Sequence, residues 1–276
     1  FADVVNAVSG RYALEIQTPQ FGEGLDFLLR EQREKLFGVL NGIDYDEYNP
    51  ATDEFITAKY DLSKIEEKQV NKLVLQRECG LTIDPDILVI GIISRLTDQK
   101  GFDMMAKLID PILNLDLELV VLGTGDPKYH DIFERVKQRY PTKAAVYLTF
   151  DTALAHRIYA GSDMFLMPSN FEPCGLGQLI SLHYGTIPIV RNTGGLADTV
   201  HDYNSQTGEG NGFVFDTSGT YQRRSMDRAA ALFAAIVGVL ETHKNKEAWR
   251  GLVERAMTAD NSWGNSAKKY EVLYQK

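Results

Sequence analysis

The chain has 276 residues, of which 44% are hydrophobic and 24% are charged, and its net charge is −9. This length and composition are typical of a globular chain with one large domain and additional segments. The acidic balance argues against a nucleic-acid partner, because nucleic acids are bound by basic surfaces. The sequence also has no apolar run of membrane-spanning length, so we expect no membrane partner.

The first 42 residues predict a small unit of their own. VVNAVSG and RYALEIQ indicate a strand and a helix, and KLFGVLNG indicates a second strand. We interpret residues 1–42 as the end of a preceding domain. The polar stretch 44–60 predicts a connector, within a segment 43–84 that leads into the next domain. The chain opens at Phe1 without a leader sequence, so we expect a fragment without a signal peptide.

From residue 87 onward, short apolar runs alternate with segments of helical spacing. Such runs predict buried parallel strands, and their alternation with helices predicts an α/β fold with a Rossmann-like, doubly wound parallel sheet over residues 85–258. The predicted strands are 87–93, 117–123, 144–150, 163–168, 186–191 and 212–215. The predicted helices are 101–110, 127–140, 151–161, 175–184, 195–202, 221–242, 245–258 and 262–275.

Ligands of an open α/β sheet bind beyond the carboxyl ends of the strands, so the loops there are the candidate site. After strand 87–93, Arg95 and Lys100 are spaced to clamp a diphosphate, although a solvated loop with unrelated charges has the same pattern. After strand 163–168, a helix start near Gly175 offers free N–H groups to an anion. Glu172 just upstream either caps this helix or contacts sugar hydroxyls.

Several classes of site are excluded by the motifs. The turn after strand 117–123 fails the dinucleotide fingerprint because its sixth position is Lys128, which favours a tight turn alone. There is neither a G-x-S-x-G elbow nor a Walker A loop. Cys79 and Cys174 are too few for a four-cysteine zinc site or a disulfide framework, and we expect a reducing compartment. His156, His183 and His201 lack metal-ligand spacing, so we expect core or helix-surface histidines and no metal.

Six segments together resemble the bacterial glycogen synthase and plant starch synthase family, over essentially the whole chain. The resemblance implies a GT-B fold, in which two Rossmann-like domains face each other across a cleft, and this chain would be the second domain. It also implies an ADP-glucose:α-1,4-glucan glucosyltransferase that retains the anomeric configuration and needs no cofactor. The segments are AVSGRYALEIQTPQFGEGL (7–25), LNGIDYDEYNPATD (40–53), SRLTDQKG (94–101), SNFEPCGLGQL (169–179), NTGGLADTV (192–200) and SWGNSAKKYEVLY (262–274).

The resemblance carries roles onto individual residues. Arg95 and Lys100 resemble the cations that bind the diphosphate, and Glu172 resembles the carboxylate that contacts the donor glucose. Phe150 stands where an aromatic ring stacks on adenine, and Asn41 matches an amide that contacts the glucose. Cys174, Gly175 and Leu176 resemble backbone donors to sugar and phosphate. The other implied nucleotide-sugar-binding residues are Ser94, Thr149, Gly177, Thr193, Gly194 and Gly195.

Two positions depart from related patterns. Gly177 stands where the family usually has Thr or another side chain, which puts a side-chain phosphate contact in doubt. Ile180 stands where many other retaining GT-B enzymes have a second Glu, eight positions after the first. Starch and glycogen synthases also lack that Glu, so this departure favours the narrower family.

The resemblance further implies that about half of the enzyme is missing. The absent amino-terminal domain would supply a K-x-G-G-L motif and a His, and helix 259–276 would return to it. We therefore expect a chain that folds and binds ADP weakly but transfers no glucose, with residues 1–42 and 262–275 mobile or packed on another molecule. The location would be the cytoplasm of a bacterium or the plastid stroma of a plant. Two alternatives stay open, namely another GT-B transferase and a non-catalytic nucleotide- or glucan-binding module.

Overall fold

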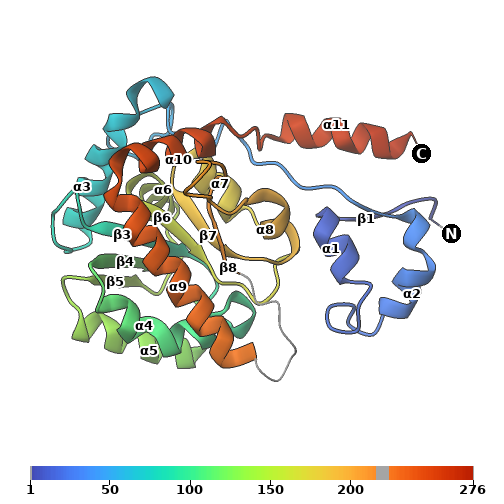
Figure 1. Ribbon diagram of the computed structural model, residues 1–276, viewed down its shortest axis with the longest axis horizontal. Helices are drawn as coiled ribbons and strands as arrows, with labels where there is room; N and C mark the ends of the chain where they lie inside the picture. Colours follow the sequence, from blue (N-terminus) through green and yellow to red (C-terminus); the bar gives the residue numbers. More distant parts are fainter. Residues whose placement is uncertain (1, 216–223, 276) are drawn as a thin grey trace.

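The computed structural model describes residues 2–215 and 224–275, which form a six-stranded parallel sheet between helices and a smaller unit beside it (Figure 1). The strand order is β5–β4–β3–β6–β7–β8. From β3 the chain therefore adds β4 and β5 on one side, and then β6, β7 and β8 on the other side of β3. All six predicted strands are present. Their bounds are β3 (Leu88–Ile93), β4 (Leu117–Leu122), β5 (Ala144–Tyr147), β6 (Met164–Met167), β7 (Ile187–Arg191) and β8 (Phe213–Phe215).

The predicted helices of this domain are also present, within a few residues at their ends. The predicted segment 221–242 begins in residues outside the described part and is a helix from Arg224. The helices are α4 (Phe102–Leu113), α5 (Pro127–Arg139), α6 (Thr152–Gly161), α7 (Gly177–His183), α8 (Gly194–Thr199), α9 (Arg224–Lys244), α10 (Lys246–Thr258) and α11 (Trp263–Tyr274).

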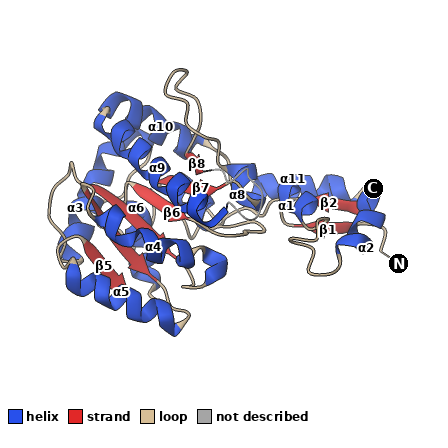
Figure 2. Cartoon of the chain, turned by 60° about the horizontal axis from the view of Figure 1, so that its bottom comes forward, coloured by secondary structure: helices blue, strands red, loops and turns tan. Residues whose placement is uncertain are grey.

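Helices cover both faces of the sheet, as Figure 2 shows. Alternate residues of a strand point to opposite faces. In β3, Leu88 and Ile90 join the cluster formed with α4, α5 and α9, whereas Val89 joins the cluster on the other face. That second cluster includes residues of α6 and of a helix that precedes the sheet. Both faces of the strands are therefore buried, which explains why their sequences are continuously apolar.

The segment 43–84, expected as a connector and domain entry, contains a helix that the sequence pattern did not predict. After the polar stretch 44–60 come a 3₁₀ segment η2 (Leu62–Glu67) and helix α3 (Lys68–Glu78). Helix α3 buries polar side chains that have specific tertiary partners: Asn71 Oδ1 accepts from Ala58 N–H at 2.9 Å, and Lys72 pairs with Asp163 at 2.7 Å. Because these buried positions are polar, the segment lacks the apolar stripe that marks a helix in sequence.

The smaller unit contains the predicted elements of residues 1–42. It comprises the parallel strands β1 (Val5–Ala7) and β2 (Leu36–Gly38), helices α1 (Gly10–Glu15) and α2 (Asp26–Glu31), and the 3₁₀ turn η1 (Arg33–Lys35). The carboxyl-terminal helix α11 runs alongside it (Figure 1), and Asn6 Nδ2 donates to Tyr270 Oη at 3.1 Å. Residues 1–42 and 262–275, expected to be mobile or packed on another molecule, thus contact each other within this chain.

A buried carboxylate anchors the connector 44–60 to the sheet domain. Asp53 Oδ2 accepts from Tyr184 Oη at 2.6 Å and lies 2.8 Å from His156 Nδ1. Tyr48 stacks on the His156 ring. Burial by itself raises the pKa of Asp53, but the hydrogen bonds from His156 and Tyr184 outweigh it and leave the pKa below its usual value. His156 is thus a core residue, as predicted.

We expect Asp53→Ala to lower the free energy of unfolding by about 3–5 kcal/mol, because it leaves His156 and Tyr184 buried without their acceptor. The folded-state pKa of Asp53 is lowered, so its contribution is present at neutral pH and is lost as the pH falls below about 4. Urea unfolding at pH 7 measures the difference. The exposed Asp46→Ala is the matched control. A loss below about 1 kcal/mol for Asp53→Ala would show that the network is weak.

Candidate active site

A cavity of about 250 Å³ opens at the carboxyl ends of β3 and β6. The strand order reverses between these two strands, and open α/β sheets bind their ligands at this switch point. Seven predicted site residues line the cavity, from the loops that follow the two strands. They are Ser94, Arg95, Lys100, Glu172, Gly175, Leu176 and Gly177.

An ion pair joins the two loops inside the cavity. Lys100 Nζ lies 2.5 Å from Glu172 Oε2, and Ser169 Oγ donates to the same oxygen at 3.0 Å. Lys100 ends the 3₁₀ turn η3 (Asp98–Lys100), and Gly101 follows it with φ 81°. A Cβ at Gly101 would lie 2.1 Å from the Pro168 carbonyl oxygen, so only glycine lets the loops approach this closely.

The alternative role of Glu172 as a helix cap is wrong. Helix α7 begins at Gly177, two residues after the predicted start, and its N-cap residue Leu176 makes no side-chain hydrogen bond. The Glu172 carboxylate instead faces Lys100 and Ser169. It is thus placed to bind hydroxyl groups of a ligand in the cavity, with a cation beside it.

Arg95 is exposed and donates from Nη2 to Gln99 Oε1 at 3.2 Å. Arg95 and Lys100 thus provide two cations to the lining of the cavity, in a chain whose net charge is −9. A guanidinium group offers forked donors and an ammonium group a point charge, and both suit phosphate oxygens.

Several predicted residues do not line the cavity. Phe150 lies beyond the end of β5 with 82% of its surface exposed, and Thr149 precedes it. The backbone N–H of Asn41 donates a hydrogen bond to the Cys174 sulfur, and burial raises the pKa of this thiol. Thr193, Gly194 and Gly195 begin α8 beside the loop of Glu172.

Sequence reasoning missed other lining residues, among them Ser169, Phe102 and Tyr159. Ser169 lies in the loop that follows β6, so its place near a strand end was the available signal. Phe102 and Tyr159 come from α4 and α6, and the sequence marks them only as apolar helix residues.

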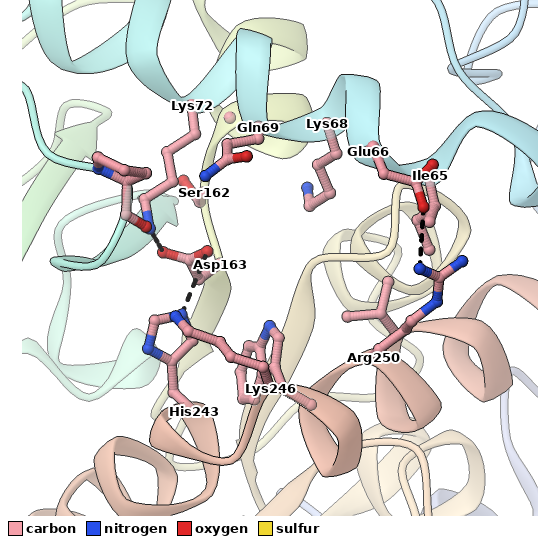
Figure 3. Close-up of a pocket in the computed structure, with 14 residues that line it drawn as sticks. Ile65, Glu66, Lys68, Gln69, Lys72, Ser162, Asp163, His243, Lys246 and Arg250 are labelled. Carbon is pink, nitrogen blue, oxygen red and sulfur yellow. Dashed lines mark hydrogen bonds and ion pairs between the residues drawn. The ribbon is translucent and has the colours of Figure 1, made fainter.

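A more apolar cavity of about 350 Å³ lies at the opposite, amino-terminal edge of the sheet (Figure 3). Its charged groups are already bound within the protein. Lys72 pairs with Asp163 at 2.7 Å and Arg250 with Glu66 at 2.9 Å. Lys68 donates to the Ala160 carbonyl at 2.8 Å, and its burial lowers its pKa to about 7. This cavity holds none of the predicted site residues.

Within residues 2–215 and 224–275, no group of three or more His, Cys, Asp or Glu side chains is arranged to hold a metal ion. Over the same residues, no helix is both long and apolar enough to cross a membrane.

The parallel sheet and its switch-point cavity define the carboxyl-terminal domain of a GT-B glycosyltransferase. Residues 80–225 match the family "Glycosyl transferases group 1", which is more than half of the chain, and the chain belongs to this family. Over its whole length it is 51% identical to a glycogen synthase of Clostridium perfringens and 48% identical to one of Thermotoga maritima. It spans 55% of the length of each of these relatives.

Solved structures support the same assignment. The catalytic domain of starch synthase IV from Arabidopsis thaliana, bound to ADP and acarbose, matches the whole chain with a TM-score of 0.89 and 38% identity, and the match covers 56% of that structure. Sucrose-phosphate synthase from Thermosynechococcus elongatus matches with a TM-score of 0.62 but only 17% identity, which is a likeness of fold alone. The similarity is thus much greater to starch and glycogen synthases than to a sucrose-phosphate synthase.

Proposed function

We propose that this chain is the nucleotide-sugar-binding part of a glucosyltransferase. The protein would move glucose from ADP-glucose to the 4-hydroxyl of an α-1,4-glucan end, with retention at the anomeric carbon. The observation that carries this proposal is the switch-point cavity in which Arg95, Lys100 and Glu172 converge. The similarity to glycogen synthases over the whole chain supports it.

In the proposed reaction, the bond between glucose and ADP breaks and negative charge develops on the diphosphate. Arg95 and Lys100 would stabilise this charge, because fixed cations in a cavity act most strongly where charge develops. Glu172 would hold the glucose through its hydroxyl groups. Lys100 is bound to Glu172 in the structure, so an incoming diphosphate would share this cation with the carboxylate.

The acceptor glucan would lie in a cleft between this domain and an amino-terminal domain. Since the chain spans about half the length of its relatives, that second domain would be the chain's main partner. We propose that residues 1–42 are the end of that domain, 43–84 the connector and the entry to the next domain, 85–258 the nucleotide-sugar domain and 259–276 the returning helix. Similarity to bacterial proteins supports a cytoplasmic location.

The test is transfer of radiolabelled glucose from ADP-glucose to glycogen. We expect turnover by the full-length protein and none by the 276-residue chain, which would still bind ADP. Without the opposite wall of the cleft, the chain positions no acceptor and leaves the sugar in water. Absence of transfer by the full-length protein, with ADP binding retained, would favour a non-catalytic binding module. Turnover by the chain alone would contradict the need for a second domain.

We expect ADP to bind more tightly than UDP, through stacking of the base on the exposed ring of Phe150. A purine offers more ring surface than a pyrimidine, and Phe150→Ala should cost about 1–3 kcal/mol of ADP affinity in calorimetry. Phe27, exposed on α2 and remote from β5, provides the control Phe27→Ala. Equal affinities for ADP and UDP, or no effect of Phe150→Ala, would rule out this role.

A further inference from the structure

Helices α1 and α8 are far apart in sequence but lie next to each other (Figure 1). Each helix provides a carboxylate to the start of the other. At the start of α8, Gly194 N–H donates to both carboxylate oxygens of Glu15 at 3.1 Å, and Thr193 Oγ1 donates to Oε2 at 3.2 Å. In the opposite direction, Arg11 N–H at the start of α1 donates to Asp198 Oδ2 at 2.9 Å. Each helix start thus receives a negative charge from its neighbour, which is the favourable sign at this end of a helix.

The Glu15 carboxylate is well enclosed. Its side chain is 11% exposed, and the Arg11 guanidinium lies 3.3 Å from Oε1. Thr193, its hydroxyl donor, is 2% exposed. A partly buried carboxylate with charge-assisted and backbone hydrogen bonds is held firmly in one position. An anionic ligand at Thr193 and Gly194 would therefore have to displace Glu15.

The start of α8 leaves no space between itself and the loop that carries Glu172. Gly195 N–H donates to the Glu172 carbonyl oxygen at 3.0 Å. A Cβ at Gly194 would lie only 1.9 Å from that same oxygen, and one at Gly195 would lie 2.1 Å from the Cys174 carbonyl oxygen. A shift of the start of α8 must therefore shift the backbone of the Glu172 loop.

The same contact fixes the smaller unit on the sheet domain. Two segments of the chain connect the smaller unit to the sheet domain, one near Ile43 and one near Ser262. A β-bridge between these two residues holds the two segments side by side. Because the two connecting segments lie side by side, they act as a single hinge, about which the smaller unit could rotate. The contact of α1 with α8 is a second attachment away from that point, and it opposes rotation.

We propose that Glu15 is a positioning residue, which couples the placement of residues 1–42 to the geometry of the Lys100–Glu172 pair. The coupling runs from the Glu15 carboxylate through Gly194 and Gly195 to the Glu172 backbone. Its catalytic consequence rests on the proposed function. In this role Thr193, Gly194 and Gly195 serve the contact between the two units and not the nucleotide sugar.

Hydrogen exchange on the 276-residue chain tests the coupling without any assay of activity. In Glu15→Ala, exchange at the amides of 194–199 should rise, and exchange at 169–177 should rise with it by about tenfold. The exposed Glu31→Ala on α2 is the control and should change neither segment. A rise confined to 194–199 would mean that Glu15 is only a local cap, and would overturn the proposal.

Kinetics of the full-length protein test the consequence. Glu15→Ala should lower kcat about tenfold, through misplacement of Glu172, with the ADP dissociation constant changed less than about twofold. Glu15→Gln keeps an oxygen acceptor at the same reach and should recover most of kcat. Glu15→Asp keeps the charge but is one carbon shorter, and should not.

The two conservative variants keep the test decisive if Glu15→Ala does not fold. Equal kcat values for the Gln and Asp variants, or a kcat for Glu15→Ala within twofold of the unchanged protein, would overturn the positioning role. If the unchanged full-length protein transfers no glucose, the proposed function fails, and hydrogen exchange alone still decides whether Glu15 couples the two segments.

Discussion

Lys100→Ala in the full-length protein is expected to lower kcat by about 100- to 1,000-fold, the usual effect of removing one preorganised donor to a developing charge. Lys100, like Arg95, lines the switch-point cavity, and its side chain is 18% exposed. In the partly enclosed cavity its charge is screened less than at the surface. The loss should appear mainly in kcat, since the diphosphate carries the most charge in the transition state.

The variant also leaves Glu172 without its cation. This effect must be separated from the loss of the proposed contact with the diphosphate. The double variant Lys100→Ala/Glu172→Gln removes the uncompensated carboxylate, and comparison with the single variants gives the coupling of the pair. Lys107→Ala, an exposed lysine on α4, is the control for a lost surface charge. A kcat for Lys100→Ala within tenfold of the unchanged protein would show that Lys100 only pairs with Glu172 and does not act on the diphosphate.

The sheet could be predicted from sequence because each of its strands is apolar on both faces. The ends of the strands were less predictable, as β5 shows. The apolar run continues to Phe150, but the strand ends at Tyr147, whose register partner Leu122 is the last residue of β4. Gly123 then turns away with φ 154°, so residues after Tyr147 have no neighbouring strand to pair with. The hydrophobicity of one strand does not show where the neighbouring strand ends.

Helix α3 was missed for a related reason. Its buried face carries Asn71, Lys72 and Gln76, which form hydrogen bonds with residues outside the helix, namely Ala58, Pro85 and Glu118. Periodicity detects a buried face only when that face is apolar. The Asp53–His156 pair is likewise invisible in sequence, because 103 residues separate its members.

In the candidate site, too, some residues could be placed from the strand pattern, whereas others are brought together only by tertiary contacts. Residues directly after β3 and β6 could be placed at one sheet edge from the strand pattern alone, and Arg95, Lys100 and Glu172 do converge there. Glu15 could not be placed, since 179 residues separate it from Gly194 and only the docking of two units brings them together. Sequence motifs marked Gly194 and Gly195 as special. The structure supplies a reason in their close approach to the Glu172 loop.

Glu172→Gln in the full-length protein is expected to lower kcat by about 100-fold or more while ADP affinity stays the same or increases. The two effects differ because, in the proposed reaction, the carboxylate would face the glucose and Lys100 would serve the diphosphate. Glutamine keeps the size of the side chain but cannot neutralise Lys100, which lies 2.5 Å from the Glu172 carboxylate. The cation, released from its internal partner, should attract the diphosphate of ADP more strongly.

The measurements for this variant are kcat from glucose transfer to glycogen and the ADP dissociation constant from calorimetry. Glu134→Gln, on the exposed face of α5, removes one carboxylate away from the cavity and should change neither quantity. A thermal midpoint close to that of the unchanged protein would show that the loop has kept its structure. If Glu172→Gln weakened ADP binding as much as it lowered kcat, the carboxylate would be supporting the shape of the whole cavity. A specific contact with the transferred glucose would then be ruled out, because such a contact acts on the transition state and leaves the binding of ADP alone.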